Sequence, residues 1–283
     1  MSNENLSYCG NVVRKYDPDR FLISLFAPAE RREALWALFA FNYEVSKTRA
    51  VVSDAALGRI RVQWWREEVE KIFGIEGNYS SIPDHEVLGP LAEAIRDYNL
   101  SFDLFDDLFT AWSFDLEDGQ PETLNALLFY SGRMEEPLLS LALRIMGGEE
   151  ALEPVSPIAV NYALAVILRR VPLDARQERC LLPEDLMNLH GVSLGALYCL
   201  EPEDGFDELV GCVVDEFVTD ICTHNALLNA VQHLSMIYAA QIRRRRFKLF
   251  SPKMATPPAF KELRLALRGL PFIMKERIRK NAA

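Results

Sequence analysis

The chain has 283 residues, of which 49% are hydrophobic and 25% are charged, the composition of an ordinary globular protein. No apolar run reaches the roughly 18 residues that a membrane-spanning helix needs, and the N-terminus carries no secretory or transit pattern, so we expect a cytoplasmic location. The five cysteines form no CxxC pair and the four histidines form no HExxH motif. The sequence therefore predicts neither a disulfide framework nor a zinc site.

Charge is unevenly distributed along the chain. The net charge is −10, but 13 of the 31 Lys and Arg residues, and only two of the 41 Asp and Glu residues, lie between Gln241 and the C-terminus. A basic segment on an acidic chain implies an anionic partner, which is either the acidic body of the protein itself or an external anion.

Helical periodicity dominates the chain, and strand alternation is nearly absent. Pro28 opens the first predicted helix, which continues through AERREALWALFAFNYEVSKTRAVV. Ser53 is expected to cap the helix SDAALGRIRVQWWREEVEKIF, with Asp54 in its first turn. Ser101 is expected to cap the helix that begins at Phe102. No repeat or long linker divides the chain, so we predict one all-α domain over residues 1–283. The remaining predicted helices cover 87–99, 121–147, 155–171, 206–245 and 258–280.

Three aspartates share one face of the predicted helix that follows Ser101. Asp103, Asp106 and Asp107 are spaced i, i+3 and i+4, which is a way to present carboxylates to Mg²⁺. Phe105 and Phe109 lie on the opposite face, as in an ordinary amphipathic surface helix, and nothing phosphate-binding accompanies the aspartates. We therefore interpret this acidic face as a solvent or partner surface.

Four segments resemble the squalene/phytoene synthase family, which is all-helical and joins prenyl diphosphates head to head. The resemblance covers most of residues 8–200 and implies a single isoprenoid-synthase-type helical bundle. The stretches Tyr8–Lys15 and Ala40–Glu44 resemble one branch in particular, the one that includes the mitochondrial complex I assembly factor. The four segments are SLFAPAERREALWALFAFNYE, QWWREEV, FDLEDGQPETLNALLFYSGRMEEPLLSLALRIMG and RRVPLDARQERCLLPEDLMNLHGV.

The first aspartate-rich motif of that family is lost in this chain. By the resemblance, Ser46, Lys47 and Ala50 occupy its aspartate positions. Tyr43 replaces a family arginine that contacts diphosphate, and Phe21 replaces a diphosphate-binding serine. Cations in place of carboxylates repel divalent metal ions from this place.

The second motif is also degraded. Val166 stands where the family has asparagine and Arg170 where it has the first aspartate, while Arg169 and Asp174 keep the pattern. A prenyl diphosphate ionises when several Mg²⁺ ions, held by carboxylates, neutralise its leaving group. One aspartate cannot position such a cluster, so we predict no catalytic residue and no metal ligand.

Two interpretations of the cations in these motifs stay open. In the first interpretation, the cations form a metal-free anion site that binds a prenyl diphosphate or another anionic lipid through charge-assisted hydrogen bonds. Alternatively they form ion pairs with Glu44, Asp174 or other nearby carboxylates, because buried cations are usually paired. The candidates are Lys47, Arg49, Arg169 and Arg170.

Basic and apolar residues alternate in the segment 241–283. A basic amphipathic segment of this kind suits an anionic membrane surface, and it would equally suit docking on the acidic body. Nucleic acid is not an expected partner, because the rest of the chain is acidic and carries no recognised binding motif.

Two functions from different classes are consistent with these features. The first is a non-catalytic scaffold that assists assembly of a respiratory membrane complex of the complex I type, needs no cofactor, binds a protein partner and attaches to the inner face of the membrane. The second is a prenyltransferase with an altered site, which would join farnesyl or geranylgeranyl diphosphates with Mg²⁺. The missing aspartates favour the first.

Overall fold

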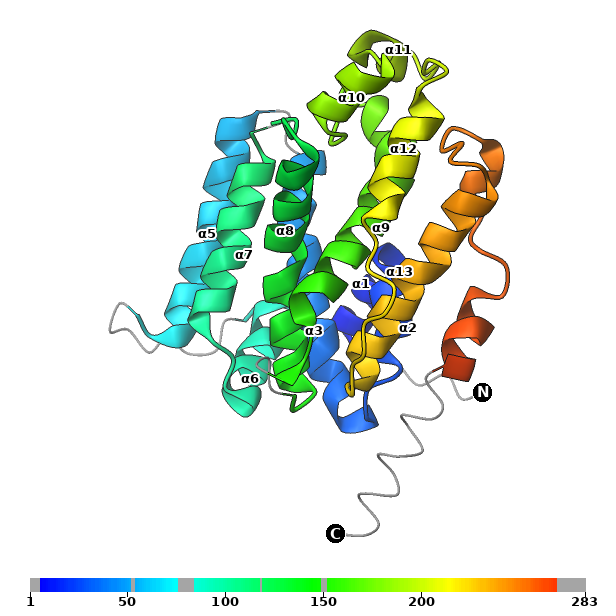
Figure 1. Ribbon diagram of the computed structural model, residues 1–283. Helices are drawn as coiled ribbons and strands as arrows, with labels where there is room; N and C mark the ends of the chain where they lie inside the picture. The colour runs from blue at the N-terminus through cyan, green and yellow to red at the C-terminus, as the bar shows by residue number, and fades with distance from the viewer. Residues whose placement is uncertain (1–5, 52–53, 76–83, 118, 149–151, 269–283) are drawn as a thin grey trace. The chain divides into compact units, whose positions relative to one another are not determined.

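The computed structural model of the protein describes residues 6–51, 54–75, 84–117, 119–148 and 152–268. Within these ranges every regular element is a helix (Figure 1). Thirteen α-helices and a further helical stretch at 261–268 are described. The predicted all-α class is therefore confirmed. None of the helices in the described ranges is long and apolar enough to cross a lipid bilayer.

The helices group into two compact units, which we describe separately. The division passes through the long helix α8 (Leu124–Ile145) at Pro137, a proline inside the helix. The prediction of one domain over the whole chain stays a prediction. The first unit comprises Met1–Glu117, Pro137–Glu153 and His224–Leu227, and the second comprises Asp118–Glu136, Pro154–Thr223 and Leu228–Ala283.

The first unit is organised around α3, which packs against α1, α2 and α6, while α5 packs against α6 and α7 (Figure 1). Phe41 of α3 meets the edges of Trp65, Phe105 and Phe109 at centroid distances of 5.8, 5.6 and 5.7 Å. These buried edge-to-face contacts join α3 to α5 and α7. The helices are α1 (Tyr8–Tyr16), α2 (Pro18–Ser24), α3 (Ala29–Ser46), α4 (Thr48–Val51), α5 (Ala55–Phe73), α6 (Leu88–Tyr98) and α7 (Phe102–Asp115).

The predicted first helix is divided in the structure, because α3 ends at Ser46 and α4 begins at Thr48. Lys47 between them keeps right-handed angles, φ −66° and ψ −12°. The hydroxyl of Ser46 donates to the carbonyl of Tyr43 at 2.9 Å, the same carbonyl that accepts the Lys47 N–H. Serine back-bonding of this kind competes with the helical ladder and bends helices, which accounts for the interruption.

The predicted cap of α5 was wrong. The N-cap residue is Asp54, whose carboxylate accepts from the N–H of Ala56 at 2.7 Å, and Ser53 lies outside the described residues. Ser101 does occupy the N-cap position of α7, but its hydroxyl makes no capping hydrogen bond. The helix predicted at 87–99 is present as α6.

In the second unit α12 packs against α9 and α10. The helix α9 continues to Ala175, beyond its predicted end at 171, although Pro172 lies inside it. After α13 a short 3-10 helix, Pro252–Met254, leads to a helical stretch at 261–268, and the rest of the helix predicted to 280 lies outside the described residues. The helices are the first part of α8, α9 (Val155–Ala175), α10 (Glu184–His190), α11 (Leu194–Tyr198), α12 (Phe206–Asp215) and α13 (Ala226–Arg244).

The single helix predicted over 206–245 was also wrong, because α12 ends at Asp215 and α13 begins at Ala226. The buried side chain of Asn161 bonds both backbone groups of Val218, accepting from its N–H at 3.0 Å and donating to its carbonyl at 2.8 Å. The buried amide of Gln232 donates to the same carbonyl at 3.0 Å. These two amides take the place of helical hydrogen bonds, so the non-helical backbone is satisfied.

Candidate functional site

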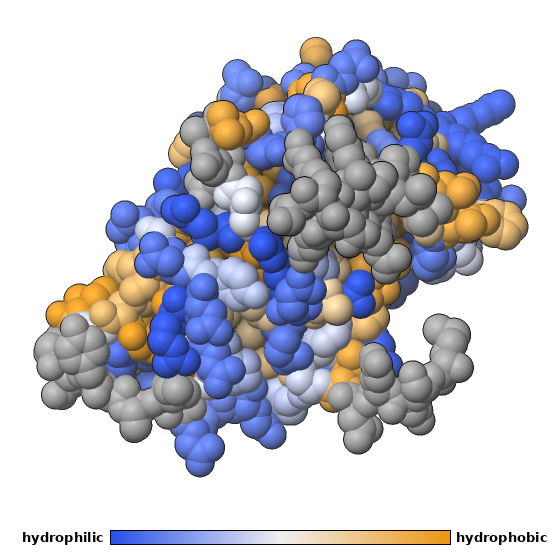
Figure 2. Space-filling model, turned by 90° about the horizontal axis from the view of Figure 1, so that it is seen from below, coloured by the Kyte–Doolittle hydropathy of each residue, from blue (hydrophilic) through white to orange (hydrophobic). Residues whose placement is uncertain are grey.

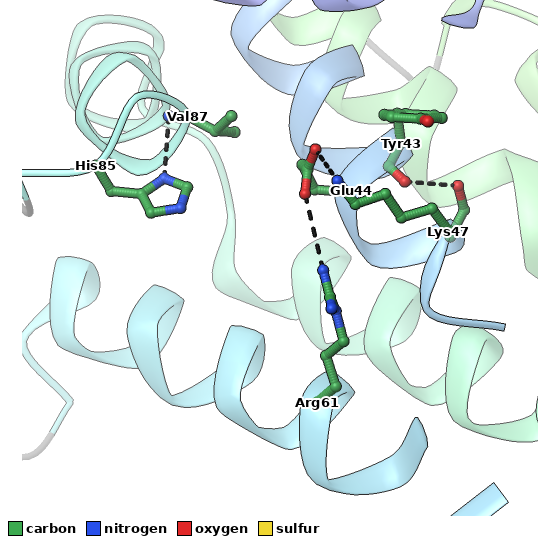
Figure 3. A network of polar contacts seen from close by, with 7 residues as sticks. Tyr43, Glu44, Lys47, Arg61, His85 and Val87 are labelled. Carbon is green, nitrogen blue, oxygen red and sulfur yellow. Dashed lines mark hydrogen bonds and ion pairs between the residues drawn. The ribbon is translucent and has the colours of Figure 1, made fainter. Parts of the chain in front are cut away.

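The first-motif region, Tyr43–Arg49, lies at the end of α3 and in α4 of the first unit (Figure 3). The ammonium of Lys47 is 2.5 Å from Oε1 of Glu44, one helical turn earlier, and 5.5 Å from the centroid of the Tyr43 ring. The other carboxylate oxygen of Glu44 lies 4.0 Å from the guanidinium of Arg61 on α5. Glu44 therefore pairs with two cations, and Lys47, the C-cap residue of α3, has a partner in the last turn of that helix.

Arg49 ties α4 to the end of α7. Its guanidinium donates to the main-chain carbonyl of Asp115, a residue that is only 5% exposed. Asp115 belongs to the FDL sequence that resembles the mid-chain motif of the family. Within the first unit, Arg49 thus makes a structural contact between two helices.

Aromatic rings occupy the neighbouring positions of the first unit. Tyr43 stacks on Tyr16 with 4.7 Å between centroids and 8° between planes. Burial, the Tyr16 ring and the charge of Glu44 raise the pKa of the Tyr43 hydroxyl above its usual value. Phe21 stacks on Trp36 with 5.8 Å between centroids. The two residues predicted to replace a family guanidinium and a family hydroxyl, Tyr43 and Phe21, thus both pack on other rings; the correspondence of positions stays a prediction.

The second-motif region, Val166–Asp174, is part of α9 in the second unit. A guanidinium nitrogen of Arg170 is 3.1 Å from Oδ1 of Asp174, one turn later; the arginine side chain is 51% exposed and the aspartate side chain 6%. The guanidinium of Arg169 lies 3.7 Å from the centroid of the Tyr238 ring on α13. Asp174, the residue predicted to remain from the second motif, is therefore paired with an arginine.

The structure gives each half of the predicted cation set its own surroundings. Lys47 and Arg49 belong to the first unit, and Arg169, Arg170 and Asp174 to the second. The ion pairs expected with Glu44 and Asp174 are present within the respective units. That the four cations act together on one anion stays a prediction.

The aspartates of α7 lie on the polar side of that helix. Asp106 forms an ion pair with Arg66 of α5, and Asp103 and Asp107 are exposed. Phe105 and Phe109 are buried on the other side, as the amphipathic pattern indicated. Across the described part of the chain, no three His, Cys, Asp or Glu side chains are grouped as a metal ion would need.

The sequence analysis missed Tyr238, whose ring contacts Arg169, and Lys261, which contacts Tyr238. Tyr238 is fully buried, and its hydroxyl accepts a hydrogen bond at 3.4 Å from the ammonium of Lys261, itself 8% exposed. Both follow Arg169 by a long stretch of chain, and no local spacing links them. The one signal in the sequence was Lys261 itself, a lysine at the start of the amphipathic helical stretch 261–268.

Comparison with known proteins gives consistent results. The sequence model of the squalene/phytoene synthase family matches residues 13–246. Complex I assembly factor 6 of Bos taurus is 32% identical over 189 residues, 66% of this chain and 55% of that protein. The chloroplastic phytoene synthase of Daucus carota is 24% identical over 206 residues, 68% of this chain and 49% of that protein. The chain thus spans about half the length of these curated relatives.

The fold is shared with solved structures. The squalene synthase HpnC from Alicyclobacillus acidocaldarius superposes with a TM-score of 0.70 at 18% identity, over 84% of this chain and 93% of that one. At this identity the likeness establishes the fold alone. The predicted isoprenoid-synthase-type helical fold is confirmed.

Proposed function

Because the chain belongs to the squalene/phytoene synthase family, we propose that it is a non-catalytic member that acts as a scaffold in the assembly of a respiratory membrane complex of the complex I type. The relatives named complex I assembly factor 6 support this, at 32% identity in cattle and 31% in humans. The role of those relatives is carried over to this chain as a proposal, because the matched region is about half of their length.

One observation carries the proposal: cations paired within the chain stand where metal-binding carboxylates are expected. Lys47 is neutralised by Glu44, and the remaining aspartate of the second motif, Asp174, is occupied by Arg170. A family enzyme holds Mg²⁺ ions with carboxylates so that the diphosphate can leave. Mg²⁺ prefers several hard oxygen ligands, and paired cations at these positions oppose its binding.

The direct test is genetic. In the organism that encodes this chain, deletion of the gene should deplete assembled complex I on native gels, and a Lys47→Ala/Arg170→Ala variant should restore it, because neither side chain is proposed to do chemistry. Prenyl-derived hydrocarbons should keep their normal amounts. Intact complex I with loss of a squalene- or phytoene-type product would overturn the proposal.

The alternative function is a head-to-head prenyltransferase with an altered site. The phytoene synthase relatives and the retained Arg169 and Asp174 favour it. Such an enzyme would need Mg²⁺, and Asp174 would have to exchange Arg170 for the metal ion. Incubation of the purified protein with farnesyl or geranylgeranyl diphosphate and Mg²⁺, followed by analysis of the extracted lipids, tests it.

We also propose a protein of the membrane complex as partner and a peripheral location on the inner, cytoplasmic face of the membrane. The excess of Lys and Arg in 241–283 supports attraction to anionic lipid headgroups. If the motif cations have a ligand besides their ion pairs, a prenyl diphosphate or another anionic lipid fits their charge. Nucleic acid is not proposed as a partner.

A further inference from the structure

The C-terminal basic segment divides into a docked side and an exposed side. On the helical stretch 261–268, Lys261 is 8% exposed and Leu265 is 1% exposed. The ammonium of Lys261 donates to the hydroxyl of the buried Tyr238 on α13. Lys261 and Leu265 are spaced i and i+4, so one face of this stretch is fixed to the second unit.

The chain leading to this stretch is fixed as well. The ring of Phe250 lies 5.4 Å from that of Phe206 on α12, measured between centroids, and Leu249 is 2% exposed. The side-chain amide of Gln241 donates to the carbonyl of Thr256 at 2.9 Å. The stretch 261–268 is therefore held in a defined orientation by the second unit.

The other face of the stretch is apolar and open to solvent. Phe260, Leu263 and Leu267 are 74%, 55% and 61% exposed. Leu263 and Leu267 are spaced i and i+4, so they lie on one side of the stretch, and Phe260 directly precedes its first turn, with a left-handed φ of 56°. Figure 2 shows hydrophobic residues standing among hydrophilic ones on one face of the molecule. Three large apolar side chains are thus exposed within eight residues of chain, and such a concentration of exposed apolar side chains is a feature of interaction surfaces.

Basic side chains accompany this apolar face. Arg264 and Arg268 lie on the same stretch and are exposed, and Glu262 is the one acidic residue between 241 and 268. The sequence continues after Arg268 with further apolar and basic residues, GLPFIMKERIRK. Other exposed basic residues of the segment are Arg243, Arg244, Arg246, Lys248 and Lys253.

We propose that Phe260, Leu263 and Leu267 insert into the headgroup region of an anionic lipid bilayer, with Arg264 and Arg268 in contact with the lipid charges. Apolar anchors beside exposed cations are the combination that interfacial helices use on anionic membranes. The charge of the segment is complementary to such a surface. This inference rests on the proposed membrane location and names the residues that make the contact.

The burial of residues within 241–283 determines which variants can test the proposed membrane contact. Removal of 241–283 would expose the core, because Ile242, Leu249 and Leu265 are buried, so substitutions on the outer face are needed. The test variant is Phe260→Ser/Leu263→Ser/Leu267→Ser. The matched control, Phe129→Ser/Leu152→Ser/Leu189→Ser, changes one phenylalanine and two leucines that are 71%, 74% and 74% exposed elsewhere on the chain.

The assay is sedimentation of the full chain with phosphatidylcholine vesicles that do or do not contain phosphatidylglycerol. We expect the wild type and the control variant to bind the phosphatidylglycerol vesicles, and the test variant to bind at least about tenfold more weakly. Arg264→Gln/Arg268→Gln should weaken binding less and reduce its salt dependence. Circular dichroism checks that all variants keep their helices.

Three results would overturn the inference, and they separate it from the proposed function. A test variant that binds like the wild type would show that another surface contacts lipid, while the membrane location stands. Equal binding to both kinds of vesicle would remove the role of the arginines. No binding by the wild type would remove the inference and the membrane location together, whereas the assembly role is judged by the native gels.

Discussion

The two motif regions both contain cations, but the contacts of those cations differ. In the first-motif region the partner of Lys47, the C-cap residue of α3, is Glu44 in the last turn of that helix. In the second-motif region Arg170 also has a partner one turn away, whereas Arg169 lies on the ring of Tyr238, which reaches it from α13. In each region one cation, Lys47 or Arg170, is paired one turn away. The other cation contacts a distant part of the chain, which is the backbone carbonyl of Asp115 for Arg49 and the buried ring of Tyr238 for Arg169.

This difference predicts unequal energies. An ion pair between residues one helical turn apart, such as Glu44–Lys47, contributes little, about 0.3–0.5 kcal/mol. A fully buried tyrosine that meets Arg169 on its ring and Lys261 at its hydroxyl contributes through packing, a cation–π contact and a hydrogen bond. Disturbing the second-motif region should therefore cost more free energy of unfolding than disturbing the first.

The largest effect is expected for Tyr238→Ala. The change leaves a cavity and removes the ring from Arg169, so we expect the free energy of unfolding to fall by about 3–5 kcal/mol. Tyr238→Phe keeps the ring and loses the hydrogen bond to Lys261, at a cost of about 1 kcal/mol. Chemical denaturation measures both, and equal losses in the two variants would contradict the role of the ring.

A smaller loss is expected for Leu265→Ala, which tests whether the C-terminal stretch is part of the second unit. The side chain is 1% exposed, so its truncation should cost about 2 kcal/mol. The matched change Leu263→Ala, on a side chain that is 55% exposed, should cost less than about 0.5 kcal/mol. Thermal unfolding compares them; similar values would mean that the stretch does not dock as described.

In the first-motif region, Glu44→Gln should cost about 1 kcal/mol, because it weakens the ion pairs with Lys47 and Arg61 at a side chain that is 12% exposed. Lys47→Met should cost less than about 0.5 kcal/mol, since its side chain is 28% exposed. Urea denaturation of both variants provides the values. A loss from Lys47→Met as large as that from Tyr238→Ala would break the comparison between the regions.

The smallest effect concerns His233 on α13. Burial, and then the positive charge of Arg268, lower the pKa of His233 below its usual 6.5. Because the folded state binds the proton less readily than the unfolded state, stability contributed by this group is present above about pH 6.5 and is lost as the pH falls towards the lowered value. Arg268→Gln should raise the pKa partway back and weaken this pH dependence.

An NMR titration of the His233 ring in the wild type and in Arg268→Gln makes the measurement. Arg264→Gln, on the same stretch, serves as the control and should leave the pKa of His233 nearly unchanged. An unchanged pKa in Arg268→Gln would show that the C-terminal stretch does not approach α13.

Local patterns in the sequence were sufficient for much of the fold. The helical spacing of Phe105 and Phe109 gave the buried face of α7, and the i, i+3 and i, i+4 spacings of Glu44–Lys47 and Arg170–Asp174 indicated their ion pairs. These features depend on residues within two turns, which the chain presents directly.

Features that depend on distant residues were not predictable in the same way. The interruption between α12 and α13 follows from Asn161 and Gln232, which hold the backbone of Val218. The partner of Arg169, Tyr238, lies on another helix. In each case a buried side chain supplies a contact that depends on tertiary packing. The local pattern predicted a continuous helix over 206–245, and it gave no indication of Tyr238 as a partner of Arg169.

The central claim is that the family's Mg²⁺-diphosphate chemistry has been lost from this chain. Calorimetric titration of the purified protein with farnesyl diphosphate, in the presence and absence of Mg²⁺, tests it most directly. We predict that Mg²⁺ has no effect: either no heat of binding is seen, or binding is the same with and without the metal ion and is weakened by Lys47→Ala and Arg169→Ala. Binding that requires Mg²⁺ would contradict the account.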